Sequence, residues 1–304
     1  MKLKTKDLLT LEELNNNELS HIIDFGIKLK KELKNGKTKP ILKNKTLAMI
    51  FQKPSTRTRV SFETGMFQLG GHALNLSSNE LQLSRGESIE DTARTLSRYT
   101  DIILARVYDH KMIEILSKNS TVPVINGLSN SFHPCQTLAD LMTIKEKKKK
   151  LQGLKIAWIG DGNNVCNSLI YGCSKSGINI SIATPKGFEP NREVIKKSKM
   201  NIEIETITNP EIAIKNADVV MTDTFTSIHN IDTKREKKFL PKFQINTSLM
   251  KKAKTNAIFM HCLPAKRGHE VTSSVIDGPQ SVVWDQAENR LHTQKALLVS
   301  LLGI

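Results

Sequence analysis

Short apolar runs rich in β-branched residues alternate with segments of helical periodicity along the whole chain. In the first half, the runs that predict strands are residues 46–51, 72–76, 101–106 and 122–126. In the second half, they are residues 154–160, 178–184, 201–207, 217–223 and 256–262. Helical patterns fall between the strands, notably at 57–70 and 87–100. This alternation is typical of α/β proteins with parallel sheets.

The two series of strands are separated by a predicted helix at 137–150, which is followed by a turn at Gly153. We therefore predict an α/β fold with two doubly wound parallel-sheet domains, 1–150 and 151–285. The last segment, 286–304, is amphipathic and long enough for a helix, so we expect it to pack back on the first domain. Ligands of such sheets bind at the loops that leave the carboxyl ends of the strands, where functional side chains are therefore expected.

Composition narrows the class of protein. The 304 residues are 38% hydrophobic, which is ample for the cores of two domains. The sequence has no apolar run of about 18 residues, the length that a membrane span needs, and its charged N-terminus lacks the apolar core of a secretory signal. The four cysteines have no paired spacing, which argues against a zinc site or a disulfide framework. We expect a cytoplasmic protein that does not associate with membranes.

The formal net charge of +15 raises the alternative of nucleic-acid binding. Lysines are spread along the chain, however, aromatic residues make up only 5%, and no nucleic-acid motif is present. The lysine-rich run at 145–150 is most simply a solvated helix end. We therefore expect small anionic substrates and no nucleic-acid partner.

Hydroxyl groups and an arginine follow the first predicted strand. The turn at Pro54 leads to Ser55, Thr56, Arg57 and Thr58, and either Ser55 or Thr56 is suited to cap the next helix. A helix N-terminus attracts phosphate, hydroxyls add donors, and a guanidinium matches phosphate oxygens. The pattern favours an anion site, although an ordinary capped helix with exposed arginines would look similar.

Two further strand ends carry polar side chains of the same kind. Arg106 ends the strand at 101–106, while His133 and Gln136 follow the strand at 122–126. A lone histidine is usually structural, but these three together supply positive charge and neutral donors for an oxyanion and a carbonyl group. Preorganised donors of this type are typical of electrostatic catalysis.

The second half begins with a loop that resembles part of a dinucleotide fingerprint. Gly160 and Gly162 fit its start, but Val165 stands where the third glycine belongs, and no acidic residue ends the following strand. The features of a nicotinamide-dependent dehydrogenase are therefore incomplete. The neighbouring Asn163 and Asn164 instead bring amide groups to this strand end.

Other strand ends of the second half favour an amino-acid site. Asp223 and Ser227 follow the strand at 217–223, and Asp223 is able to pair with an ammonium group. Cys262 lies at the end of the strand at 256–262. An acid, a thiol and two amides indicate an amino acid rather than a second phosphate group as the ligand.

Four ordered motifs carry a resemblance to a known family. They are Ser55-Thr56-Arg57-Thr58, the sequence HPCQ from His133 to Gln136, the sequence HCLPAKRGHEVT at 261–272 and the sequence ENRLHTQKALL at 288–298. From about residue 5 to its end, the chain resembles the aspartate/ornithine carbamoyltransferases, and most closely their ornithine-specific members. The resemblance implies that the carbamoyl group of carbamoyl phosphate is transferred to the δ-amine of L-ornithine, giving L-citrulline and phosphate in amino-acid metabolism such as arginine synthesis.

The resemblance also implies the site residues. Those that bind carbamoyl phosphate would be Ser55, Thr56, Arg57, Thr58, Gln82, Arg106, His133, Gln136, Cys262, Leu263 and Arg290. Those that bind ornithine would be Asn164, Asp223, Ser227 and Ile228. The catalytic residues among them would be Arg57, Arg106, His133, Asp223 and Cys262. No metal and no other cofactor is implied. Domain 1–150, with the C-terminal helix, would bind carbamoyl phosphate and domain 151–285 ornithine, the two forming one crevice.

The same resemblance implies a homo-oligomer, a trimer at least, in which Gln82 reaches the neighbouring subunit's site.

One loop departs from the family pattern, which reads Asp-x-Trp-x-Ser-Met-Gly, because the chain has Phe225, Ile228 and His229 in place of Trp, Met and Gly. Histidine for glycine removes conformational freedom from a loop expected to close over substrate. Alternative acceptors are aspartate, an acylated ornithine or putrescine, and a non-catalytic protein of the same fold is the alternative outside enzymes.

Overall fold

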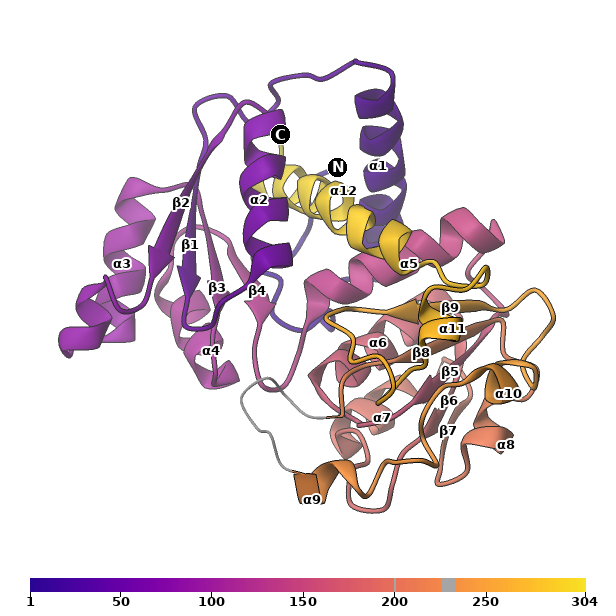
Figure 1. Cartoon of the computed structure of the whole chain (residues 1–304). Coiled ribbons are helices and arrows are strands. Elements are labelled where there is room, and N and C mark those ends of the chain that lie inside the picture. The colour runs from indigo at the N-terminus through magenta and orange to yellow at the C-terminus, as the bar shows by residue number, and fades with distance from the viewer. Residues whose placement is uncertain (200, 226–232) are drawn as a thin grey trace. The chain divides into compact units, whose positions relative to one another are not determined.

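The computed structural model describes residues 1–199, 201–225 and 233–304, which form two compact units (Figure 1). The first unit comprises Met1–Met142 and Glu288–Ile304, and the second comprises Thr143–Ala287. Each unit is built on a parallel sheet with helices on its faces, so the predicted α/β fold class is confirmed. Within the described ranges, no helix combines the length and the apolar character needed to cross a bilayer.

The first unit contains a four-stranded parallel sheet in the order β2-β1-β3-β4. Its strands are β1 (Thr46–Phe51), β2 (His72–Ser77), β3 (Ile102–Arg106) and β4 (Val124–Leu128). The chain turns to one side after β1 and to the other after β3, so the loops that follow these two adjacent strands diverge. Such a switch point is where ligands bind in doubly wound sheets.

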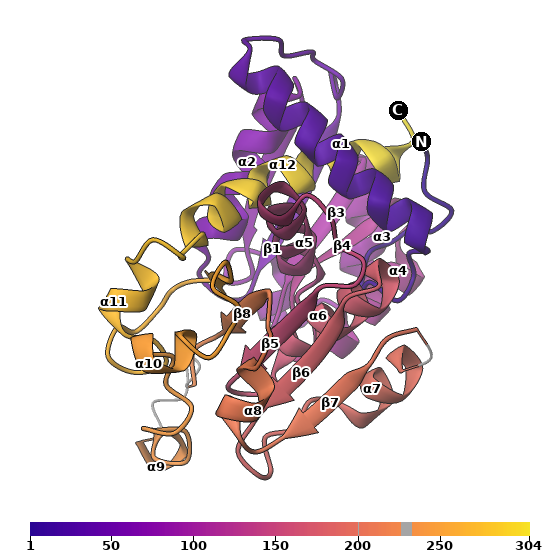
Figure 2. The ribbon, with the colours of Figure 1, turned by 90° about the vertical axis from the view of Figure 1, so that its right-hand side faces the viewer.

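Helices cover both faces of this sheet. They are α1 (Asn16–Lys34), α2 (Thr56–Gln68), α3 (Ile89–Tyr99), α4 (His110–Asn119), α5 (Pro134–Lys148) and α12 (Val283–Leu302), with a short 3-10 helix η1 (Gln82–Arg85). Helices α3 and α4 lie together on one face, and α1, α2 and α12 lie on the other (Figure 2). The sequence patterns did not assign α1, although Asn15 and Glu18 form a capping box at its start.

The C-terminal helix α12 packs on the first unit, as predicted. Lys30 on α1 donates from Nζ to Asn289 Oδ1 at 2.7 Å. Glycines allow the helices to approach closely, because a Cβ added to Gly26 would lie 3.4 Å from the Thr293 Cα, and one added to Gly65 would lie 3.2 Å from the Lys295 Cγ. Helix α12 is therefore part of the first unit's core although it comes last in the chain.

The second unit contains a five-stranded parallel sheet in the order β7-β6-β5-β8-β9. The strands are β5 (Lys155–Ile159), β6 (Asn179–Ala183), β7 (Ile204–Ile207), β8 (Val219–Thr222) and β9 (Ile258–His261). The helices are α6 (Asn164–Ser176), α7 (Arg192–Ser198), α8 (Pro210–Ile214), α9 (Thr233–Glu236), α10 (Thr247–Met250) and α11 (Ser273–Ile276). The loops after β5 and β8 diverge at the switch point of this sheet.

The glycine loop after β5 has a packing role. A Cβ added to Gly162 would lie 2.2 Å from the Pro190 backbone nitrogen and 2.7 Å from the Phe188 carbonyl oxygen. Gly162 also donates its N–H to that carbonyl at 2.9 Å. The close approach of two backbone segments therefore accounts for this glycine without a bound dinucleotide.

We expect Gly162→Ala to destabilise the protein by about 1–3 kcal/mol, because the new methyl group overlaps backbone atoms that cannot rotate away. Thermal unfolding followed by circular dichroism measures the change. Gly36→Ala is the control: its Cβ would meet no atom within 4 Å, so only the strain of its φ of +67° remains, about 1 kcal/mol. Equal melting temperatures for Gly162→Ala and the wild type would contradict the packing role.

Candidate active site

The N-terminus of α2 is held by its capping residue. Ser55 Oγ accepts the Thr58 N–H at 3.3 Å, so Ser55 rather than Thr56 is the cap. The first N–H groups of a helix have no acceptor within the helix, and those of Thr56 and Arg57 point from this end. The end of α2 is therefore able to offer backbone donors and a partial positive charge to an anion.

A buried guanidinium joins three helices beside that end. Arg290 on α12 donates from Nη2 to Thr58 Oγ1 at 3.1 Å and from Nη1 to Gln136 Oε1 at 2.7 Å. Its Nε donates to Gln294 Oε1 at 2.9 Å. The structure thus brings together residues of α2, α5 and α12 that are far apart in the sequence, and all four side chains are buried.

His133 lies among three arginines. Burial holds the pKa of this imidazole well below its usual range, and the positive charges of Arg290, Arg106 and Arg57 lower the pKa further. The ring is therefore neutral at pH 7, when one of its nitrogens carries a proton and is able to donate to a carbonyl oxygen. Positive charge for a phosphate and a neutral donor for a carbonyl are thus combined in one place.

A cavity of about 250 Å³ adjoins this anion site through Ser55. Lys53 and Asn75 also line it, and Lys53 Nζ lies 4.1 Å from the centre of the Tyr108 ring. Burial and the charge of Arg106 lower the pKa of Lys53. Gln82 is an exposed residue of η1, and it is not among the residues that line this cavity.

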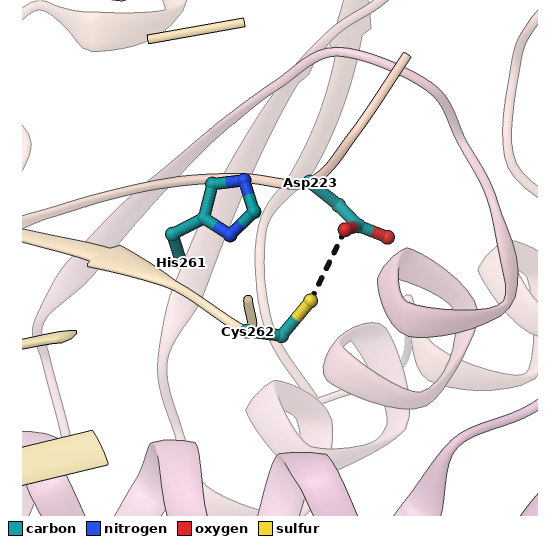
Figure 3. A group of neighbouring side chains, drawn as sticks. All are labelled: Asp223, His261 and Cys262. Atoms are coloured by element: carbon teal, nitrogen blue, oxygen red, sulfur yellow. Dashed lines mark hydrogen bonds between the residues drawn. The ribbon is translucent and has the colours of Figure 1, made fainter. Parts of the chain in front are cut away.

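The second unit holds an acid and a thiol at the ends of two adjacent strands. Asp223 follows β8 and Cys262 follows β9, and Cys262 Sγ donates to Asp223 Oδ1 at 3.1 Å (Figure 3). Asn163 Nδ2 donates to Asp223 Oδ2 at 2.7 Å, and the Thr224 N–H donates to Oδ1 at 2.7 Å. The thiol therefore carries its proton in this arrangement.

The two asparagines at the start of α6 have different hydrogen-bond partners. Asn163 caps α6, with Oδ1 accepting the N–H groups of Val165 and Cys166, while its amide holds Asp223. Asn164, which the resemblance singled out, accepts the Val165 N–H at 3.1 Å. Asn163 thus orients the acid, and Asn164 is the first residue of α6.

The turn after β9 is fixed by a buried histidine that the sequence patterns did not single out. His261 Nδ1 accepts the Leu263 N–H at 2.9 Å, and its Nε2 lies 3.3 Å from Glu270 Oε1. Because Nδ1 is an acceptor, Nε2 carries the proton and donates to Glu270. Leu263 has a φ of +58°, an unusual conformation for a leucine that these bonds maintain.

Asp223, His261 and Cys262 also have the chemistry of metal ligands. Their ligand atoms lie within 4.8 Å of one another in the described part of the chain. Each group already has a partner, because the thiol donates to the acid and both imidazole nitrogens face protein groups. A cation would have to replace the thiol proton and break a bond of His261, so the hydrogen-bonded arrangement does not resemble a preformed metal site.

Arg235, which follows residues 226–232, is bonded to Phe225, which precedes them, and forms an ion pair with Asp161. Arg235 pairs with Asp161, donates from Nε to the Phe225 carbonyl at 2.9 Å, and lies 4.7 Å from the centre of the Phe188 ring. Burial raises the pKa of Asp161 to about 6, an effect that the charge of Arg235 opposes. Ser227, Ile228 and His229 lie outside the described residues.

Three other cysteines have structural surroundings. Cys135, Cys166 and Cys173 are buried. Burial raises the pKa of the Cys135 thiol to about 12 and that of Cys166 well above its usual range. Cys262 differs from them because it is only partly buried and its thiol donates to the candidate site residue Asp223.

Sequence reasoning missed a second set of polar residues behind the anion site. Ser61, Asp140 and Gln294 each follow a site residue by four positions on the same helix and bond to it. Residues at this spacing lie on one face of a helix. The spacing was thus the available signal.

Comparison with protein families gives two adjacent matches. Residues 6–146 match the carbamoyl-phosphate-binding domain of aspartate/ornithine carbamoyltransferase, and residues 152–301 match the aspartate/ornithine-binding domain. Together these matches cover nearly the whole chain.

Individual relatives are similar over their full length. The chain is 61% identical to an ornithine carbamoyltransferase from Cenarchaeum symbiosum, covering 99% of both sequences. The solved structure of an ornithine carbamoyltransferase from Pyrococcus furiosus is 54% identical, with a TM-score of 0.95 and coverage of 98% of this chain and 97% of that chain. That of an anabolic ornithine carbamoyltransferase from Campylobacter jejuni is 40% identical, with a TM-score of 0.90 and 99% coverage of both chains.

The low pKa of His133 predicts loss of stability in acid. Below about pH 6.5 the unfolded chain takes up a proton on this histidine and the folded chain does not. Stability therefore falls as the pH falls below 6.5, by up to about 1.4 kcal/mol per pH unit for each such group. His292, whose pKa burial lowers to about 4, acts in the same direction.

Urea unfolding at a series of pH values from about 4.5 to 7.5 measures this slope. We expect His133→Gln to reduce the slope of stability against pH by up to about 1.4 kcal/mol per pH unit, the contribution of one proton. His72→Gln, at an exposed position of β2, should retain the wild-type slope. An unchanged slope in His133→Gln would contradict the neutral, buried state of this ring.

Proposed function

The chain belongs to the aspartate/ornithine carbamoyltransferase family, and on that premise we propose that it transfers the carbamoyl group of carbamoyl phosphate to the δ-amine of L-ornithine. The products are L-citrulline and phosphate. The observation that carries this proposal is the cluster of Arg57, Arg106 and Arg290 around a neutral His133 at the N-terminus of α2. Such a cluster suits a ligand with both a phosphate and a carbonyl group.

In the proposed complex, the first unit binds carbamoyl phosphate. The phosphate lies at the end of α2, where Ser55, Thr56 and Thr58 donate from hydroxyl or N–H groups and Arg57 and Arg106 neutralise its charge. Thr58 accepts from Arg290 and so keeps its own O–H as a donor. His133 and Thr58 polarise the carbonyl oxygen, with Gln136 and Arg290 at the carbamoyl end.

The second unit binds the amino acid. Asp223, oriented by Asn163, pairs with the α-ammonium group, and Asn164 holds the α-carboxylate. Family membership supports roles for Ser227 and Ile228 beside them. Cys262 lies next to the δ-amine. Its thiol donates to Asp223, the same carboxylate that pairs with the α-ammonium group. The main chain at Leu263 completes the carbonyl contacts.

The reaction needs no covalent intermediate on the protein. The neutral δ-amine attacks the carbonyl carbon, and a tetrahedral intermediate forms whose oxyanion is stabilised by the preorganised donors. The intermediate then collapses as the C–O bond to phosphate breaks, and phosphate takes up the proton that the amine loses. Arginines and a helix N-terminus stabilise charge on the leaving phosphate throughout.

Self-association is part of the proposal. Phe67 is 82% exposed and Val60 is 53% exposed. They are seven residues apart on α2, which places them on the same face of this helix. Leu74 is exposed on the edge strand β2. Large exposed apolar groups gathered on neighbouring elements indicate a covered surface. We propose that a homotrimer buries them and that Gln82 reaches the neighbouring subunit's site.

Steady-state formation of citrulline tests the activity. With carbamoyl phosphate as donor, we expect ornithine to be carbamoylated with a kcat/KM at least about 10³ times that of aspartate, putrescine or acetylornithine, because only ornithine matches both the acid and the amide groups. Preference for any of the other three acceptors would overturn the choice of ornithine.

Substitution of Arg57 tests the proposed carbamoyl-phosphate site. Arg57→Gly is expected to lower kcat/KM for carbamoyl phosphate by about 10³-fold or more, because the charge on phosphate loses its nearest partner. Arg98→Gly removes an exposed arginine of α3 and is the matched control. Kinetics of Arg57→Gly like those of the control would refute the assignment.

Light scattering after size-exclusion chromatography tests the trimer. The wild type should have three times the mass of one chain, and Phe67→Glu should dissociate it, because a charge cannot be buried unpaired at an interface. Tyr99→Glu, at a position on α3 that is 75% exposed, should leave the mass unchanged. A monomeric wild type would contradict the proposal.

A further inference from the structure

A buried carboxamide connects the C-terminal helix to the first turn of α2. Gln294 Oε1 accepts from Arg290 Nε at 2.9 Å, and Gln294 Nε2 donates to Ser61 Oγ at 2.6 Å. Ser61 in turn donates to the Arg57 carbonyl at 2.5 Å. The chain of bonds therefore runs from α12 to the backbone of the residue whose guanidinium is proposed to hold phosphate.

The hydrogen-bonding roles in this chain are fixed by chemistry. A guanidinium only donates, so the end of Gln294 that faces Arg290 is its oxygen and the other end is its NH₂ group. Ser61 accepts from that NH₂ group and donates its own proton mainly to the Arg57 carbonyl at 2.5 Å, with the Thr58 carbonyl further away at 3.3 Å. The bonds from Arg290 to Gln294, Gln136 and Thr58 orient its guanidinium.

Arg290 itself transmits a second connection to the same turn. Its Nη2 donates to Thr58 Oγ1, so Gln294 acts on α2 both through Ser61 and through Arg290. The two routes end at Arg57 and Thr58, neighbouring residues in the first turn of α2. A leucine of similar volume could fill the same space without the cost of burying an amide, but it could not orient a guanidinium.

We propose that Gln294 is a positioning residue for carbamoyl-phosphate binding. It fixes the Arg290 guanidinium and, through Ser61, the first turn of α2, so that the anion meets donors already in place. Preorganised donors need no rearrangement when the ligand binds, which is the condition for strong electrostatic stabilisation. This inference rests on the proposed function for the identity of the anion.

The test compares Gln294→Leu, Ser61→Ala and the double variant with the wild type. We expect Gln294→Leu to raise KM for carbamoyl phosphate about ten- to a hundredfold, the effect of a lost bond to a charged group, with KM for ornithine changed by less than about threefold. Because both residues act in one chain, the double variant should be no worse than Gln294→Leu alone. Thr293→Val, an equally buried neighbour whose hydroxyl bonds within α12, is the matched control.

A second readout does not depend on turnover. Inorganic phosphate should raise the melting temperature of the wild type and of Thr293→Val and should raise that of Gln294→Leu far less. If the wild type forms no citrulline, the proposed function is wrong. The phosphate comparison still tests the positioning role of Gln294 in that case. If Gln294→Leu does not fold, Ser61→Ala carries the test with an expected rise of at least about threefold in KM for carbamoyl phosphate.

A merely structural role predicts a different pattern. In that case Gln294→Leu would lower the melting temperature and leave both the KM for carbamoyl phosphate and the stabilisation by phosphate at wild-type values. That result, or strictly additive effects of the Gln294 and Ser61 substitutions, would overturn the inference.

Discussion

The part of the site that is proposed to bind carbamoyl phosphate depends on the hydrogen bonds of one buried guanidinium, that of Arg290. Arg290 reaches Thr58 on α2, Gln136 on α5 and Gln294 on its own helix. A buried charge is costly unless it is fully hydrogen-bonded, so these bonds fix the positions of all three helices. The same bonds join the last helix of the chain to the first unit, because Arg290 on α12 contacts both α2 and α5.

The candidate site residues of the two units have opposite charges. In the first, three arginines surround His133, and burial keeps the imidazole neutral so that it donates a hydrogen bond without adding repulsion among like charges. In the second, Asp223 accepts from Asn163 and Cys262, which leaves an acid aligned for an ammonium group. Positive surroundings suit a phosphate, and an oriented carboxylate suits an amino acid.

Much of the fold could be predicted because buried parallel strands are continuous apolar runs, and every predicted strand exists within a few residues. Strand ends were less predictable, because hydrogen bonding to neighbours decides where β4 and β7 begin. The bond from Asn163 to Asp223 could not be predicted, because it depends on the three-dimensional path of the loop. His261 was missed because it binds a backbone N–H. Gln294, by contrast, lies four residues after Arg290, a spacing visible in the sequence.

Isothermal titration with carbamoyl phosphate in the absence of ornithine tests the account most directly. The wild type should bind this ligand by itself, because its anion site is assembled within the first unit. Arg290→Met, of similar length but without the guanidinium, should remain folded and bind at least about tenfold more weakly. Binding by Arg290→Met as tight as that of the wild type would contradict the central role of this arginine.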